Sequence, residues 1–92
     1  MSFSRGPRQW FADIPQCTER IEKHTAGMER DGFRSDVKTI DAVERNLQKI
    51  SEAAIRLGND AERLCPGPEW RDIRGLGNWL RHQYDGLDLG VI

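Results

Sequence analysis

The stretch that decides the fold is IDAVERNLQKISEAAIRL, residues 40–57. Its apolar residues return at alternating steps of three and four, at Ile40, Val43, Leu47, Ile50, Ala54 and Leu57. This spacing lines them up on one side of an α-helix, as a seam that packs against another helix. Ser35 and Asp36 before the stretch provide an N-terminal cap, and Gly58-Asn59 after it provides a stop. The stretch therefore predicts an amphipathic helix that packs through its seam.

Upstream of this helix, Ile14, Cys17 and Ile21 also recur with helical spacing. Proline is tolerated in the first turn of a helix, so Pro15 predicts a start near Asp13. Residues 1–12 show no clear periodicity, and we expect a loose lead-in there. The glycine-containing stretch after this helix predicts its end.

Downstream, the proline- and glycine-containing segment 59–68 is typical of a connector, with room for one helical turn near residues 60–64. A further helix is predicted over residues 69–85. Its apolar face consists of Trp70, Ile73, Leu76 and Leu80. We expect Trp70 to lie in the core and Trp79 to make a dimer or lid contact.

No strand pattern appears anywhere, so the fold class is all-α, a small antiparallel helical bundle. With 92 residues the chain has room for a single domain, which we place at residues 13–92. Apolar residues make up 37% and charged residues 32%, a balance typical of a folded helical protein. A chain of this size builds only a thin core, which favours a homo-oligomer.

Charge and composition exclude several classes of function. The net charge of −1, from 14 basic and 15 acidic residues, argues against a dedicated nucleic-acid coat but permits a nuclease with a local basic cluster. No apolar run approaches the roughly 20 residues that cross a bilayer, so we expect no membrane contact. The N-terminus carries no secretory signal, which favours the cytoplasm and reduced thiols at Cys17 and Cys65.

The strongest candidate for a chemical site is the helix predicted over residues 69–85. Arg74, Asn78 and His82 are spaced by four, which places them along one polar stripe, with Arg81 and Tyr84 flanking it. An imidazole in such surroundings can act as general base or acid near neutral pH. An ordinary solvated helix face remains the alternative. No motif for a metal or a cofactor occurs, so neither is expected.

A family resemblance covers nearly the whole predicted domain. The stretches IEKHTAGM (residues 21–28), DAVERNLQKISEAAIRL (41–57) and PEWRDIRGLGNWLRHQYDGLDLGVI (68–92) resemble the HepT-like proteins of the HEPN superfamily in order and spacing. The resemblance implies a dimeric helical bundle that cleaves RNA without metal. It also implies the toxin of a type VII-like toxin–antitoxin pair, with an MntA-like nucleotidyltransferase as antitoxin. Many relatives continue into a terminal helix; either this domain lacks that helix, or the helix lies outside this sequence.

The resemblance assigns roles to individual residues. The family pattern is an arginine, usually followed by Asn or Asp, then a histidine and a tyrosine; Asn78, His82 and Tyr84 match it. His82 is implied to handle the 2′-hydroxyl proton, and Tyr84 to be the tyrosine that the antitoxin adenylylates. Gly77 stands where the arginine is usual.

The missing arginine leaves several interpretations open. Arg74, Arg81 or an arginine of the partner subunit would have to stabilise the phosphate charge in its place. Without any of them, the chain would be a non-catalytic helical partner that binds a substrate for the nucleotidyltransferase. Gly77 also costs a helix about 1 kcal/mol relative to alanine, so its presence calls for an explanation in packing or in altered function.

Overall fold

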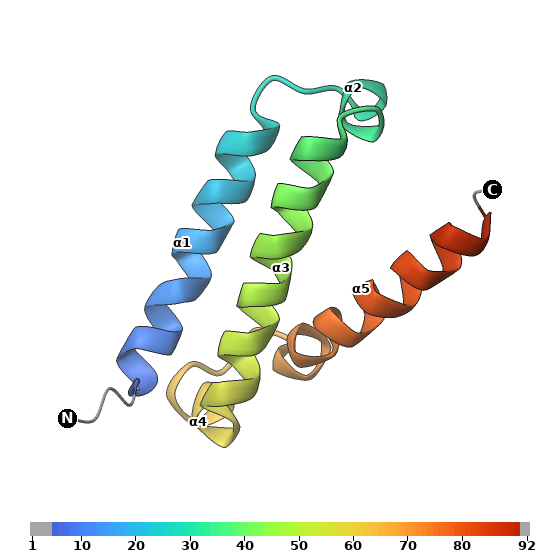
Figure 1. Ribbon diagram of the computed structural model, residues 1–92. Helices are drawn as coiled ribbons and strands as arrows, with labels where there is room; N and C mark the ends of the chain where they lie inside the picture. The colour runs from blue at the N-terminus through green and yellow to red at the C-terminus, as the bar shows by residue number, and fades with distance from the viewer. Residues whose placement is uncertain (1–4, 91–92) are drawn as a thin grey trace.

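The computed structural model describes the backbone of residues 5–90 and the side chains of residues 5–80. Within that range it contains five helices and no strand: α1 (Pro7–Thr25), α2 (Arg30–Arg34), α3 (Val37–Leu57), α4 (Asn59–Leu64) and α5 (Trp70–Gly90). Helices α1 and α3 lie side by side and antiparallel, and α5 packs against the end of α3 that leads into α4 (Figure 1). The predicted all-α helical bundle is confirmed.

Helix α3 has the ends that its sequence predicts. The carboxylate of Asp36 accepts a hydrogen bond of 3.1 Å from the backbone N–H of Thr39, which caps the helix and lowers the pKa of Asp36. At the other end Gly58 adopts φ 53°, a left-handed conformation that favours glycine, and its N–H donates to the carbonyls of Ala54 and Ile55. Local capping therefore fixes both boundaries of the predicted helix.

The predicted start of the first helix is wrong, because α1 begins at Pro7 rather than near Asp13. Pro7 occupies the first helical position, and the side chain of Gln9 accepts a hydrogen bond of 2.7 Å from the N–H of Gly6. Trp10 then extends the apolar stripe of α1 by one turn and packs against the core, so residues 7–12 are not a loose lead-in. Pro15 lies inside the helix, which gains enough packing upstream to accommodate it.

The connecting segments differ from the predictions in two places. The stretch after α1 contains a short helix, α2, that apolar periodicity could not reveal in five residues. Helix α4 matches the helical turn predicted near residues 60–64. Helix α5 begins within one residue of its predicted start but continues to Gly90, past the predicted end at Asp85, because one glycine weakens a helix without ending it.

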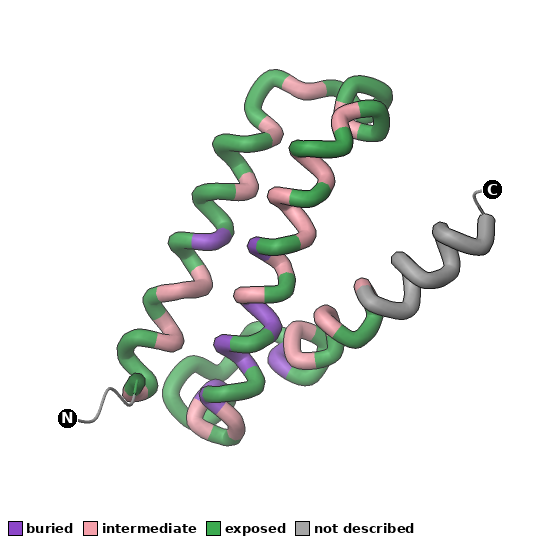
Figure 2. The backbone as a smooth tube through the Cα atoms, in the orientation of Figure 1, coloured by how far each residue is buried: buried purple, intermediate pink, exposed green. Residues whose placement is uncertain are grey.

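Burial is concentrated where α1, α3, α4 and α5 meet. Figure 2 shows most of the buried positions of α3 in the half nearer α4. The buried apolar residues are Cys17, Ile50, Ala53, Ala54, Leu57, Ala61 and Trp70. In the other half of α3, Ile40, Val43 and Leu47 are only half-buried. The core is therefore thin, as predicted, and it sits beside the start of α5.

Three further predictions concern the thiols, the tryptophans and the membrane. Cys17 is buried and Cys65 is exposed, and each is a free thiol. Trp70 lies in the core as predicted, whereas the Trp79 side chain is 56% exposed in the single chain. Among the residues that the structure describes, no helix is both long enough and apolar enough to cross a membrane.

Candidate functional site

The first turns of α5 are anchored by Trp70. Its side chain is buried, its ring meets the Phe11 ring edge-on with centroids 6.0 Å apart, and its Nε1–H donates to the carbonyl of Cys65 at 2.8 Å. The indole thus buries a large apolar surface while its only polar atom is satisfied. This contact ties the start of α5 to α1 and to the loop before it, and so sets where the rest of the helix begins.

Arg74 fastens α5 to the C-terminal end of α3. Its guanidinium donates to the carbonyls of Gly58 at 2.7 Å and Ala54 at 3.3 Å, and it forms a two-pronged ion pair with Glu62 of α4. A cation at this end of a helix satisfies free carbonyls and opposes the helix dipole. The hydrogen bonds of the pair lower the pKa of Glu62 and raise that of Arg74. In this arrangement Arg74 acts as a structural brace.

Gly77 lies in close contact with α3. Its N–H donates to the hydroxyl oxygen of Ser51 at 3.2 Å, and that hydroxyl donates in turn to the carbonyl of Arg74 at 2.9 Å. A Cβ at position 77 would lie 3.2 Å from the same oxygen, and Ser51 is only 2% exposed, so it has little room to move. Packing therefore explains the glycine that stands in the usual place of the family's arginine.

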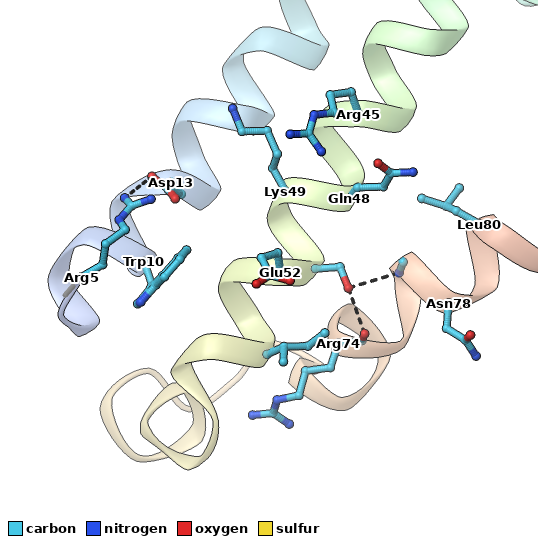
Figure 3. Close-up of a pocket in the computed structure, with 13 residues that line it drawn as sticks. Arg5, Trp10, Asp13, Arg45, Gln48, Lys49, Glu52, Arg74, Asn78 and Leu80 are labelled. Carbon is cyan, nitrogen blue, oxygen red and sulfur yellow. Dashed lines mark hydrogen bonds and ion pairs between the residues drawn. The ribbon is translucent and has the colours of Figure 1, made fainter. Parts of the chain in front are cut away.

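Arg74 and Asn78 lie one turn apart on α5, as their spacing predicts, but their side chains differ in what they contact. The guanidinium of Arg74 is bound to Glu62 of α4 and to the end of α3, whereas the carboxamide of Asn78 is exposed (Figure 3). Arg81, His82 and Tyr84 lie on the backbone of α5, but their side chains lie outside the described residues. The structure therefore places the helix that carries the predicted site without describing the whole site.

A groove of about 900 Å³ runs beside this helix. It is lined by the start of α1, by one face of α3 and by residues 74–80 of α5, and we call it the basic groove. Its charged lining residues are Arg5, Asp13, Arg45, Lys49, Glu52 and Arg74. Four cations against two carboxylates make it locally positive, although the whole chain carries a net charge of −1. Asn78 lines it as well, so the groove reaches the predicted site.

Sequence reasoning missed Ser51, Glu62, Arg45 and Lys49. Ser51 had a usable signal, because it belongs to a group of small residues on α3, with Ala53 and Ala54, and α5 carries a glycine at position 77. Small residues are typical of the contact between closely packed helices. Glu62 had none, since its partner is twelve residues away. Among the described side chains, no group of three or more histidines, cysteines and carboxylates lies close enough together to hold a metal ion.

Comparison with known proteins identifies relatives along nearly the whole chain. The family of HepT-like ribonucleases matches residues 14–92. A probable ribonuclease HepT of Thermococcus cleftensis is 35% identical over 88 residues, which cover 96% of this chain and 80% of the relative. Two putative RNases of Methanocaldococcus jannaschii are 33% and 29% identical, over 92% and 91% of this chain and 70% and 77% of their own lengths.

No solved structure matches the chain significantly. The family match covers α2, α3, α4 and α5 entirely and most of α1, so it includes the helix of the candidate site and the part of the basic groove that α3 and α5 line. Arg5, Trp10 and Asp13 of the groove lie before the matched residues. On these grounds the chain belongs to the HepT-like ribonuclease family.

Proposed function

We propose that the chain is a metal-independent endoribonuclease and the toxin of a type VII-like toxin–antitoxin pair. The observation that carries the proposal is the 35% identity to a probable ribonuclease HepT over 96% of the chain. The family match over residues 14–92 extends through α5, the helix on which Asn78, His82 and Tyr84 occupy the positions of the family pattern. The substrate is RNA, whose 2′-hydroxyl supplies the nucleophile.

The proposed reaction is an internal transesterification. His82 accepts the proton of the 2′-hydroxyl, the 2′-oxygen bonds to the adjacent phosphorus, and the bond to the 5′-oxygen breaks. The leaving 5′-oxygen takes up a proton, so the products are a 2′,3′-cyclic phosphate and a 5′-hydroxyl. Asn78, exposed on the same helix, is suited to hydrogen-bond the phosphate. No step needs a metal ion.

The charge that builds up on the phosphate calls for a guanidinium, which Gly77 cannot supply. The contacts of Arg74 argue against that residue, because its guanidinium would have to leave Glu62 and the end of α3 to reach the substrate. We therefore favour Arg81 or an arginine of the partner subunit. Single replacements of Arg74 and Arg81 by Gln separate these roles. A variant that lacks the catalytic arginine should cleave RNA more slowly at an unchanged melting temperature. A variant that lacks only a structural contact should have a lower melting temperature.

We propose a homodimer as the active form. Ile55 is 53% and Trp79 is 56% exposed, on two neighbouring helices, and the seam of α3 is only half-buried at Ile40, Val43 and Leu47. A second copy would cover apolar surface that a single chain leaves in water. Sedimentation at micromolar concentration should show the dimer, and a monomer over the whole accessible range would contradict it.

The proposed antitoxin is an MntA-like nucleotidyltransferase that silences the toxin by adenylylation of Tyr84. Tyr84 is the chain's only tyrosine and follows His82 by two residues. A phosphate there would place negative charge close to His82 and repel the RNA backbone. Incubation with the nucleotidyltransferase, ATP and magnesium should add adenylyl groups to the parent but not to Tyr84→Phe, as measured by mass spectrometry. We place both proteins in the cytoplasm, where the RNA substrate of the toxin is.

The direct test is RNA cleavage by the purified protein in the presence of a chelator. We expect cleavage with 2′,3′-cyclic phosphate ends and none of a substrate whose 2′-hydroxyls are methylated. Dependence on added metal would contradict the mechanism. Binding of RNA without cleavage would favour the alternative, a non-catalytic partner that holds a substrate for the nucleotidyltransferase, as the loss of the usual arginine at Gly77 first suggested.

A further inference from the structure

The basic groove contains two cations that form no ion pair with any described side chain. Arg5 forms an ion pair with Asp13 at 2.8 Å, and Arg74 forms one with Glu62. Glu52, the other carboxylate of the groove, is paired with Arg56 at 2.6 Å. These pairs neutralise both acidic residues of the lining and two of its four cations.

Arg45 and Lys49 are the remaining two cations, and neither forms a salt bridge within the part of the chain whose side chains are described. They lie four residues apart on α3 and therefore on one face of it. Like charges at this spacing repel and slightly destabilise a helix. The structure keeps them side by side in a groove (Figure 3), an arrangement that an anion between or above them would stabilise.

The walls of the groove favour an extended anion over a single small one. The cavity of about 900 Å³ runs from the start of α1, where the Arg5 guanidinium lies 4.4 Å from the centroid of the Trp10 ring, to Asn78 and Leu80 on α5. A positively charged groove with an aromatic side chain in its wall is the arrangement by which proteins hold single-stranded nucleic acid. The Asn78 end opens beside the helix that carries His82.

We propose that the basic groove binds the sugar–phosphate backbone of single-stranded RNA, with Arg45 and Lys49 contacting phosphates and the strand continuing toward Asn78. The inference rests on the proposed ribonuclease function, because it names the surface that delivers the substrate to the candidate site. Contacts to phosphate carry no base specificity, so the groove sets affinity and register rather than the sequence that is cut.

The test is fluorescence anisotropy with a labelled single-stranded RNA whose 2′-hydroxyls are methylated, so that binding is measured without cleavage. The groove variant is Arg45→Gln with Lys49→Gln. Its matched control is Arg20→Gln with Lys23→Gln, which removes the same two charges from exposed positions of α1 that do not line the groove. Circular dichroism checks that all variants fold.

We expect the groove variant to bind about tenfold or more weakly at low salt, and its log–log salt slope to fall by about 1.4, at about 0.7 per phosphate contact on a single strand. The control should bind within about twofold of the parent, since it touches no phosphate. Lys49→Arg, which keeps the charge, should bind like the parent.

Three results would overturn the proposal that the basic groove binds RNA. The first is an unchanged affinity and salt slope in the groove variant, and the second is a parent protein that binds no RNA. The third is a loss of binding that accompanies dissociation of an oligomer in sedimentation, which would make the groove a contact between two copies of the chain. Failure of the proposed function is distinguishable, because it appears as intact RNA in the cleavage assay whatever the binding result.

Discussion

The two halves of α3 carry the same apolar seam but differ in what covers them. Near Ile40 and Leu47 the seam is half-buried between α1 and solvent, whereas from Ile50 to Leu57 it is buried by α1, α4 and α5 together. Figure 2 shows the change along a single straight helix. The seam is apolar along its whole length, but it is fully buried only in the part that α5 crosses.

The difference also separates two kinds of contact. Helix α3 packs against α1 through apolar side chains at regular spacing. At the α5 crossing the contacts run between side chain and backbone: the Ser51 hydroxyl bonds two backbone groups of α5, and Arg74 bonds two carbonyls of α3. Such contacts fix the position and angle of α5, and α5 is the helix that carries the candidate site.

The largest expected effect on stability is the difference between leucine-to-alanine substitutions in the two halves of the seam. Leu57→Ala removes a side chain that is 4% exposed and leaves a cavity, so we expect a loss of about 3 kcal/mol in the free energy of unfolding. Leu47→Ala removes a half-buried side chain, and we expect about 1 kcal/mol. Urea unfolding measures both; equal losses would show that the two halves are equally packed in solution.

A smaller effect is expected at the helix crossing. Gly77→Ala gains about 1 kcal/mol of helix propensity, but its Cβ would lie 3.2 Å from the Ser51 oxygen, and we expect a net loss of about 1 kcal/mol. Gly75→Ala is the matched control, because nothing lies within 4 Å of its Cβ and it should stabilise the protein.

A double-mutant cycle sharpens this prediction. With Ser51→Ala in place the crowding oxygen is absent, so Gly77→Ala should become neutral or stabilising. Additive losses in thermal or urea unfolding would show that Gly77 is not explained by its contact with Ser51. The glycine would then need a different reason, such as the loss of catalysis.

The smallest effect is expected at the Arg74 brace, where Glu62 is exposed. The hydrogen bond from Arg74 lowers the pKa of Glu62, so the pair contributes stability above 4.5, the ordinary pKa of that carboxyl, and loses it as the pH falls through the lowered value. The parent should therefore be more stable than Glu62→Gln at pH 7, and the gap should close in acid. Glu52→Gln, which breaks an exposed pair within α3, is the control and should change stability less. A stability difference between the parent and Glu62→Gln that does not change with pH would contradict a stabilising role for the charge of Glu62.

The contrast between the two kinds of contact explains which predictions from sequence hold. The seam at Ile40–Leu57 and the burial of Trp70 follow from periodic apolar residues, which the chain displays directly. The start of α1 at Pro7 was missed because Pro15 resembled a first-turn proline. The contact between Ser51 and Gly77 leaves no periodic pattern in the sequence, because it joins a side chain to a backbone group twenty-six residues away.

The candidate site was predictable only in part for a related reason. Spacing places Arg74 and Asn78 on one stripe, but it does not reveal what a long side chain binds, and the guanidinium of Arg74 is engaged by Glu62 and the end of α3. The basic groove needs three helices to form, so no single stretch reveals it. His82 and Tyr84 remain predictions from the family pattern, and Arg81 remains a prediction from its place beside the polar stripe.

The most direct test of the account compares the chain's only two histidines. His82 lies on α5 in the family pattern, and His24 is exposed near the end of α1. The measurement is the rate of RNA cleavage in chelator by His82→Ala and His24→Ala, beside the parent and at equal helicity. We predict that His82→Ala loses at least about 100-fold in rate, as expected for a general base, while His24→Ala cleaves like the parent. Equal rates for His82→Ala and the parent would contradict the assignment of the ribonuclease site to α5.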